Sequence, residues 1–440
     1  MPEVISIRSA LILLSAGLTL GYASLRLGGV LSADWNVCAF ALGCLLLFGY
    51  LPLSRDAVSA PFDPLLYACI LAVPLWALLQ LVPLPAAWIA VLSPERAALS
   101  RALLHFGPVA NMPLSVRPQA TLQYGLRYLA FGATFLVTRD LMWRLPGKQW
   151  LIVLPPLLIA VVEACIGIVQ DSSGVANTTV SGTFVNRNQF SALLEMCLPF
   201  AVGLILDFAP QGARALAACV GALVSALLMA GIVLSLSRGG YFIALLSFLF
   251  LGWVYALTRL RGLARIFTML VSLLAVAGAT LALASGRLLD RMLPAAPGLA
   301  AEASLSDRIA FWKETLHVIT AYPIFGCGFG GFISAVTPFR ATAAARTLDY
   351  AHNDYLQFLA EGGFIAVIPA AIVGILIARA LWRGVFLQPH PRRRTFAIAC
   401  MVSVFAGMFH SAFDLITYVP ATGMLLCWIA GMAAGLEFDL

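Results

Sequence analysis

The sequence predicts an all-α membrane protein, a polytopic bundle of about twelve transmembrane helices. Hydrophobic residues make up 61% of its 440 residues and charged residues only 11%, whereas a soluble domain carries about 25% charged residues. Apolar runs close to the ~20 residues that a bilayer core requires recur along the whole chain. Arginine gathers in alternate short connections between these runs, as expected when successive loops alternate between the two sides of a membrane.

Each predicted span is an apolar run bounded by Arg, Pro or Gly. The runs are Ser9–Leu27, Val37–Leu53, Leu65–Pro83, Leu122–Val137, Leu151–Gln170, Phe190–Phe208, Ala215–Leu234, Tyr241–Leu257, Ile266–Ala284, Gly363–Leu381, Phe396–Phe413 and Val419–Leu436. The fourth run is the weakest because Arg127 lies inside it. The first run has no small-residue cleavage site followed by a soluble domain, so we expect a span there rather than a removed signal peptide.

Orientation follows from the short loops. With the N-terminus in the cytoplasm, one set of turns holds most of the cations, namely Arg55, Arg139, Arg144, Lys148, Arg214, Arg259, Arg261, Arg265, Arg383, Arg392, Arg393 and Arg394. The opposite short turns hold far fewer, among which Arg187 and Arg238 stand out. An even number of spans leaves both termini cytoplasmic. The net charge of +7 is modest, and we expect no nucleic-acid partner.

This orientation divides the chain into three parts. Residues 1–284 hold spans one to nine, residues 285–362 form a long outer loop that carries an active-site helix, and residues 363–440 hold the last three spans. Leu84–Thr121 is a second outer loop with several prolines and no clear period. Within the 285–362 loop, apolar residues at roughly helical spacing predict an amphipathic helix on the membrane surface or capping the bundle: Leu305, Ile309, Trp312, Leu316 and Ile319.

The sequence contains no evident metal or disulfide framework. Of the nine cysteines only Cys327 lies in a long loop, and no Cys-x-x-Cys spacing occurs. Neither a His-Glu-x-x-His pattern nor paired carboxylates at metal-binding spacing appear. We therefore expect no metal cofactor.

The polar clusters that stand out all fall on the predicted outer side. In the first, Ser181–Phe190, three residues stand where a loop turns into the sixth span: Asn186, Arg187 and Asn188. A helix start offers free N–H groups and the positive end of the helix dipole, so an added Arg makes it a suitable anion site, especially for phosphate. An ordinary Asn cap with an interfacial Arg fits the spacing about equally well.

Glu195 lies one to two turns inside the following span, where a carboxylate usually has a partner or a role. Packing against Arg187 or Arg238 is the structural alternative. Arg238 belongs to the second cluster, Ser235–Gly240, which leaves almost no loop between two spans and keeps this Arg near the membrane interface. Its two glycines permit tight backbone turns. A plain hairpin with a snorkelling Arg is the alternative reading.

Two further signals are weaker. Arg308 and Trp312 share the predicted amphipathic helix and precede a glycine-rich run, Pro323–Gly330, that on its own fits a plain turn. His410 and Asp414 lie one turn apart at the outer end of the eleventh span. They could line a cavity or simply cap the helix, and they are second-tier candidates.

The fourth cluster, Leu348–Gly363, closes the long outer loop and runs directly into an apolar span. It is polar and aromatic in a chain that is otherwise mostly apolar. If residues 349–360 form a short helix, His352, Tyr355, Leu356 and Leu359 share one face. A lone His is more often a structural residue than a catalyst. Its neighbours Asn353, Tyr355 and Glu361, together with its place at the lipid boundary, favour a catalytic role as proton acceptor.

These clusters together resemble the O-antigen ligase/polymerase family. The fourth follows the family pattern His-Asn-x-Tyr-Leu, an acidic residue and Gly in His352, Asn353, Tyr355, Leu356, Glu361 and Gly363. The stretches Gly182–Asn188 and Ser237–Gly240, and the Arg308-x3-Trp312 pair with its following glycines, resemble the family too. The resemblance implies a GT-C-like helical glycosyltransferase of the bacterial inner membrane whose outer loop closes over a site facing the periplasm.

The resemblance also implies partners and roles. The donor is a glycan on undecaprenyl diphosphate, and the acceptor is lipid A–core for a ligase or a growing glycan for a polymerase. His352 takes or orients the acceptor proton, while Arg187 and Arg238 hold the diphosphate with help from Arg308. Glu195 and Tyr355 orient these groups. The remaining substrate-binding candidates are Asn186, Asn188, Asn353 and Glu361. Arginine, rather than a metal ion, stabilises the leaving group.

Four alternatives stay open at this point. A polymerase fits the same residues as a ligase. A protein-glycosylating branch of the family usually carries a longer C-terminal extension than this chain has. A secondary transporter would suit the many spans, although broken helices and midplane charges are scarce. A non-catalytic scaffold gives no reason for the polar clusters to face one compartment.

Overall fold

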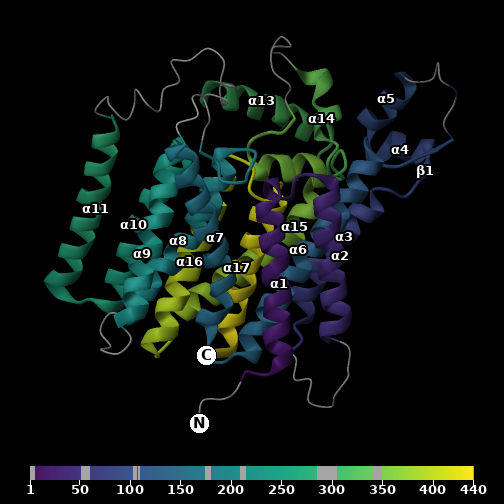
Figure 1. Cartoon of the computed structure of the whole chain (residues 1–440). Helices are drawn as coiled ribbons and strands as arrows, with labels where there is room; N and C mark the ends of the chain where they lie inside the picture. The colour runs from purple at the N-terminus through teal and green to yellow at the C-terminus, as the bar shows by residue number, and fades with distance from the viewer. Residues whose placement is uncertain are drawn as a thin grey trace.

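The computed structural model describes residues 5–50, 60–102, 107, 110–173, 180–208, 215–284, 305–340 and 349–439, and these are mostly helical (Figure 1). Within them, ten helices are long and apolar enough to cross a membrane. They are α1 (Ile7–Leu25), α2 (Ser32–Tyr50), α7 (Gln149–Ser172), α8 (Arg187–Phe208), α9 (Ala215–Leu234), α10 (Arg238–Arg259), α11 (Gly262–Ala284), α15 (Asp354–Trp382), α16 (Pro391–Ser411) and α17 (Pro420–Gly435). The prediction of a polytopic all-α bundle is confirmed.

Each of the twelve predicted segments coincides with a helix in the described residues, but two of these helices are not among the ten that are long and apolar enough to span a membrane. One is α3 (Pro64–Leu79), which has only 16 residues. The other is α6 (Pro118–Arg144), which is long enough to span a membrane but not apolar enough, and Arg127 lies within its apolar part. The count of twelve transmembrane helices therefore stays a prediction. Arg55 and Arg214 lie outside the described residues.

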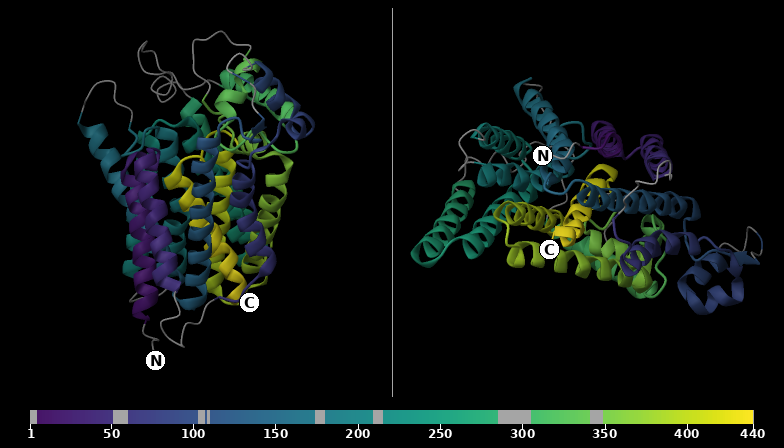
Figure 2. Two further views of the ribbon diagram at one scale, coloured as in Figure 1. Left: turned by 90° about the vertical axis from the view of Figure 1, so that its right-hand side faces the viewer. Right: turned by 90° about the horizontal axis from the view of Figure 1, so that it is seen from below.

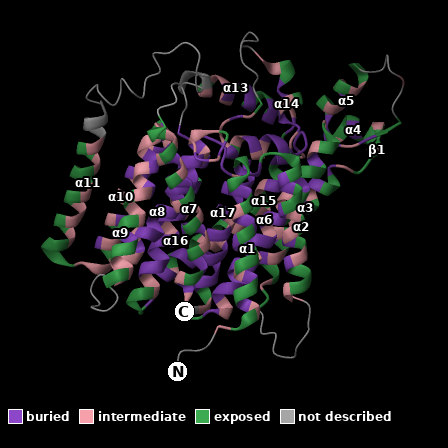
Figure 3. Ribbon diagram, in the orientation of Figure 1, coloured by how far each residue is buried: buried purple, intermediate pink, exposed green. Residues whose placement is uncertain are grey.

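The helices run side by side, and α8 and α17 lie deepest, with 72% and 78% of their apolar windows buried. Helix α8 packs against α9 and α16, and α17 packs against α6. Helix α11 stands at the edge beside α10 and buries none of its apolar window (Figures 1 and 3). Bulky side chains such as Phe190, Phe200 and Trp428 fill the interior at 1% exposure or less.

One end of the bundle is covered by short elements (Figures 1 and 2). They are α4 (Ala86–Leu92), α5 (Pro94–Ala102), α13 (Leu305–Ala321), α14 (Phe332–Ala335) and the antiparallel strand pair β1 (Leu84–Pro85) and β2 (Asn111–Met112). The described residues also form the short helices η1 (Leu27–Gly29), η4 (Thr337–Phe339), η5 (Arg383–Leu387) and η6 (Leu436–Asp439). The start of α1 and the end of η6 lie together at the opposite end (Figure 2).

The predicted amphipathic helix exists as α13, but its buried face differs from the prediction. Phe311 and Val318 point inward and pack with Cys327 and neighbouring residues. The predicted apolar positions Ile309 and Leu316 are 42% and 50% exposed. The predicted position Ile319 is buried. Glu314 and Thr315 are buried as well, so apolar spacing alone was wrong at Ile309 and Leu316.

The predicted short helix over residues 349–360 is also wrong. Helix α15 begins only at Asp354, because the side chain of Asn353 caps it by accepting a hydrogen bond from the Leu356 N–H at 3.1 Å. The helix then continues to Trp382. His352 therefore lies before the helix and does not share a face with Tyr355.

A kink at Gly363 (φ +65°) lets the glycine-rich run dock against α15. The Cys327 N–H donates to the Ala360 carbonyl at 2.9 Å, and the Phe364 N–H donates to the Pro323 carbonyl at 3.0 Å. A Cβ at Gly326 would lie 2.1 Å from the Glu361 carbonyl oxygen. These glycines thus allow backbone to approach backbone.

Candidate active site

Four segments that are distant in sequence meet at the covered end of the bundle around Asp414. The carboxylate of Asp414 accepts hydrogen bonds from Asn188 Nδ2 at 2.6 Å and from an Arg308 guanidinium nitrogen at 3.3 Å. Its other oxygen lies 3.2 Å from His352 Nδ1. We call Asn188, Arg308, His352 and Asp414 the Asp414 cluster. They come from the start of α8, from α13, from the residues before α15, and from the α16–α17 turn.

His352 is held in a conformation that residues other than glycine seldom adopt, with φ at +49°. Both neighbours are fixed: the Ala351 N–H donates to Gln357 Oε1 at 2.7 Å, and Asn353 caps α15. The imidazole faces Phe311 with ring centroids 6.2 Å apart. Its side chain is 30% exposed. Such strain persists only where the surroundings over-determine it, and it is concentrated at functional sites.

Asp414 remains ionised in this setting. Its side chain is 4% exposed, and burial alone would raise the pKa of this carboxyl. In the acid range where Asp414 titrates, the hydrogen bond and charge of the His352 imidazolium outweigh burial, and the Arg308 guanidinium adds to them. The pKa of Asp414 is consequently held well below its usual range.

The turn that carries Asp414 is clamped by the two residues that follow His352. Asn353 Nδ2 donates to the Ala412 carbonyl at 2.9 Å. Asp354 Oδ2 accepts from Ser411 Oγ, the Ile416 N–H and the Thr417 N–H at 2.9, 3.0 and 2.8 Å. Three consecutive residues, 352 to 354, therefore all bind the turn between α16 and α17.

A second His–carboxylate pair lies deeper, between α8 and α16. His410 Nδ1 is 3.0 Å from Glu195 Oε2, and the two side chains are 2% and 1% exposed. Ser191 Oγ donates to the other oxygen of Glu195 at 2.7 Å. This pair gives Glu195 a partner, though not the arginine partner that the sequence suggested. Gly240 packs directly on it, since a Cβ there would lie 1.7 Å from Ser191 Oγ.

The predicted anion-binding arginines begin neighbouring helices at this same end. Arg187 precedes Asn188, and Arg238 follows Ser237, whose Oγ donates to Asn188 Oδ1 at 2.7 Å. Arg238 is exposed, and Arg187 is half-buried. The positive φ of the α9–α10 connection falls on Leu236 (+53°), so the turn is not made by the glycines of this motif, which lie in the first turn of α10.

A comparison with protein-family models finds a match over part of the chain. Residues 223–371 match the model described as O-antigen ligase. This segment is an O-antigen ligase domain. A search of curated proteins found none that matches the chain. The O-antigen ligase match covers Arg238, Arg308 and His352, and it ends before His410 and Asp414.

Not every predicted site residue of the O-antigen ligase domain joins the Asp414 cluster. Glu361 is fully buried, and it accepts hydrogen bonds from Tyr418 Oη at 2.9 Å and from Gln357 Nε2 at 3.2 Å. Tyr355 is 46% exposed and donates to the Met408 carbonyl at 2.7 Å. Asn186 supports the cluster indirectly, because its Oδ1 accepts from the Asn188 N–H at 2.7 Å.

The sequence undervalued Asp414 and missed Ser237 and Phe311. A carboxylate just beyond an apolar span was the available signal for Asp414. No signal in the sequence could show that Ser237 bonds Asn188 or that Phe311 stacks on His352.

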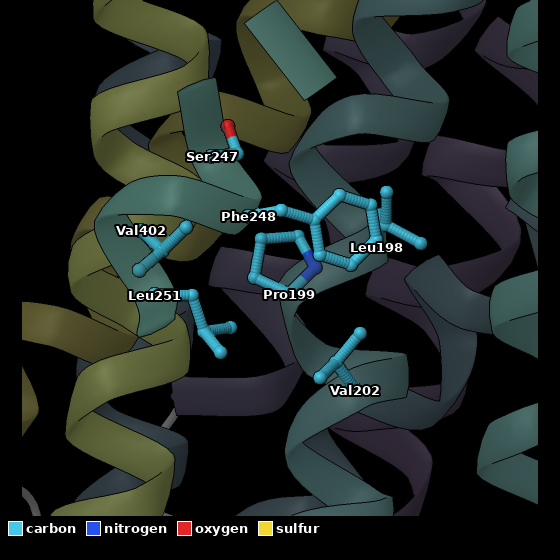
Figure 4. Close-up of a pocket in the computed structure, with 7 residues that line it drawn as sticks. All are labelled: Leu198, Pro199, Val202, Ser247, Phe248, Leu251 and Val402. Carbon is cyan, nitrogen blue, oxygen red and sulfur yellow. The ribbon is translucent and has the colours of Figure 1, made fainter. Parts of the chain in front are cut away.

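A small pocket lies between α8, α10 and α16 (Figure 4). It is lined by Leu198, Pro199, Val202, Ser247, Phe248, Leu251 and Val402. Its lining is apolar apart from Ser247, so it offers no groups for transfer chemistry. In the described part of the chain, no group of three His, Cys, Asp or Glu residues is placed to hold a metal ion, and metal independence stays a prediction.

Proposed function

We propose that this O-antigen ligase-family protein transfers a glycan from undecaprenyl diphosphate to a sugar hydroxyl of lipid A–core. The observation that carries the proposal is the His352–Asp414 pair at 3.2 Å, which lies beside two helix starts that carry arginine. Family membership supports glycan transfer as the general reaction. The donor, the acceptor and the ligase role are inferences.

The pair explains how His352 acts as a base. An ionised carboxylate only accepts hydrogen bonds, so His352 Nδ1 must carry a proton toward Asp414. The lone pair of Nε2 is then free to take the proton of the acceptor hydroxyl. As that proton arrives, Asp414 stabilises the imidazolium. Arg308 and Asn188 keep Asp414 in place.

The arginines account for the leaving group. Arg187 and Arg238 are the first residues of α8 and α10, where their guanidinium groups add to the positive end of the helix dipole. The acceptor oxygen forms a bond to the anomeric carbon while the bond from that carbon to the diphosphate oxygen breaks. The electron pair leaves with undecaprenyl diphosphate, and positive charge at Arg187 and Arg238 stabilises it.

We further propose that the site faces the periplasm of the bacterial inner membrane. Cations collect at the end of the bundle opposite the Asp414 cluster. There Arg259 binds Thr395 Oγ1 at 2.7 Å and Arg394 binds the Thr258 carbonyl at 3.2 Å. Cytoplasmic ends carry the excess of Arg in membrane proteins, so the opposite end, with the cluster, faces outward.

The test is transfer by the purified chain in liposomes with EDTA present. Undecaprenyl-diphosphate glycan is offered with lipid A–core in one reaction and with excess repeat unit in another. Product on lipid A–core supports the ligase, whereas chain growth on the lipid carrier would make the protein a polymerase. Folded protein that forms neither product would refute glycan transfer to these acceptors.

A further inference from the structure

Glu163 is a buried acidic residue that the proposed mechanism does not use. It lies in the middle of α7 at 0% exposure. A carboxyl group inside a membrane helix is energetically costly and marks a partner or a role. Both of its oxygens contact one residue of the loop before α8: the Thr183 N–H donates to Oε2 at 2.9 Å, and Thr183 Oγ1 lies 2.6 Å from Oε1.

The contacts of the Thr183 hydroxyl indicate whether the Glu163 carboxyl group is protonated. Its Oγ1 lies 2.6 Å from Glu163 Oε1 and 2.8 Å from the Ser24 carbonyl oxygen. A hydroxyl has one proton, and a carbonyl oxygen can only accept. Each contact is a full two-centre hydrogen bond only if Glu163 Oε1 carries a proton and donates it to Thr183, which in turn donates to Ser24.

A second residue of α7 binds the same loop. Gln170 Nε2 donates to the Gly182 carbonyl at 2.6 Å, and Gln170 Oε1 accepts from the Gly182 and Ser181 N–H groups at 3.0 and 3.2 Å. Gly182 has φ +57°, and a Cβ there would lie 2.3 Å from Glu163 Oε2. Residues 181–183 are thus bonded to α7 and α1 a few residues before α8 begins.

We propose that Glu163 acts as a neutral carboxylic acid that positions the loop carrying Asn186 and Arg187. The loop leads directly from the anchored Thr183 to Arg187, the first residue of α8. Under the proposed function, on which this inference rests, Arg187 holds the donor diphosphate. Glu163 is therefore a positioning residue for donor binding, and it does not touch the acceptor or His352.

The neutral form makes a sharp prediction for two substitutions. Glu163→Gln retains a donor toward Thr183 Oγ1 and an acceptor for the Thr183 N–H, so all hydrogen bonds survive. Glu163→Leu removes both. Direct binding of undecaprenyl diphosphate to the protein in nanodiscs is measured, together with KM for donor and acceptor and the thermal unfolding midpoint. We expect Glu163→Gln to match the wild type, and Glu163→Leu to weaken donor binding about tenfold with the acceptor KM unchanged.

A second pair of substitutions covers the case in which Glu163→Leu fails to fold. Thr183→Ser keeps the hydroxyl and should bind the donor as the wild type does, whereas Thr183→Val should show the weaker binding. An equal loss of donor affinity in Glu163→Gln and Glu163→Leu would refute the proposal that Glu163 is a neutral acid. Wild-type donor binding by folded Glu163→Leu or by Thr183→Val would refute the proposal that the Glu163–Thr183 contact positions this loop. Normal donor binding by Arg187→Ala would instead refute the role of Arg187 in the proposed function.

Discussion

Substituting Asp414 by Asn tests the arrangement around His352 most directly. The wild-type carboxylate receives four donors within 3.3 Å, three from side chains and one from the Leu415 N–H. An amide keeps the shape but offers one acceptor oxygen and one NH2 group, so at least one donor faces another donor. If His352 Nδ1 meets the NH2 group, the imidazole shifts its proton to Nε2 and no longer accepts the acceptor proton. The analogous change in a Ser-His-Asp triad lowers kcat about 10⁴-fold.

We expect Asp414→Asn to lower kcat by about 10²–10⁴ with little change in donor KM. Loss of the hydrogen bond to the charged Arg308 should destabilise the fold by about 1.5–3 kcal/mol. Asp140→Asn is the matched control, because Asp140 is also buried and pairs with Arg144, but it binds Tyr50 and the Ala60 N–H rather than the Asp414 cluster. It should lower stability and leave kcat intact. Asp414→Asn with kcat within threefold of the wild type would refute the reasoning.

The same substitution changes the dependence of stability on pH. The pKa of Asp414 is lower in the folded protein than in the unfolded chain, so the unfolded state binds more protons in acid. Its contribution to stability is complete above the unfolded value of about 4 and is lost as pH falls through the folded pKa. Asp414→Asn should therefore flatten the acid side of the unfolding profile. An unaltered acid slope would contradict this.

Three further predictions concern the neighbouring residues. His352→Ala should lower transfer by about 10²–10⁴ while folding and donor binding persist, and wild-type transfer by this variant would remove His352 from the mechanism. Gly240→Ala should destabilise the fold by about 1–3 kcal/mol, because the new Cβ overlaps Ser191 Oγ. Gly239→Ala is the control, because a Cβ at Gly239 would have nothing within 4 Å. Equal thermal unfolding midpoints for the two variants would refute this prediction. Arg238→Ala should raise the donor KM about tenfold or more, measured against an unchanged acceptor KM.

The ten long apolar helices were predictable because length and composition alone reveal such runs in a sequence. Asn188, Arg308 and His352 were predicted as site residues by the polar character of their surroundings. Their common partner is a tertiary feature, since Asp414 lies 62 residues from His352 and 226 from Asn188. No local pattern encodes such a distance.

The conformation of His352 could not be predicted either. Local spacing favoured a helix through this residue, but bonds from Ala351 to Gln357 and from Asn353 to Ala412 hold it in the left-handed region. Glu361 is a second residue whose contacts only the packed structure shows. It sits in a family motif, yet Tyr418 and Gln357 satisfy its carboxylate in the interior, and only the packed structure separates a structural acid from an exposed one.

The hydrogen bonds between residues 352–354 and the α16–α17 turn limit which segments of this protein can be exchanged with those of a homologue. The segment that matches the family model ends at residue 371, but Asp414 and the atoms that Asn353 and Asp354 bind come from beyond it. Grafting residues 223–371 into a distant homologue would place His352 against a foreign turn. A working chimaera must therefore exchange the outer loop and the C-terminal helical hairpin together, and substitutions in these two segments should accumulate as compensating pairs.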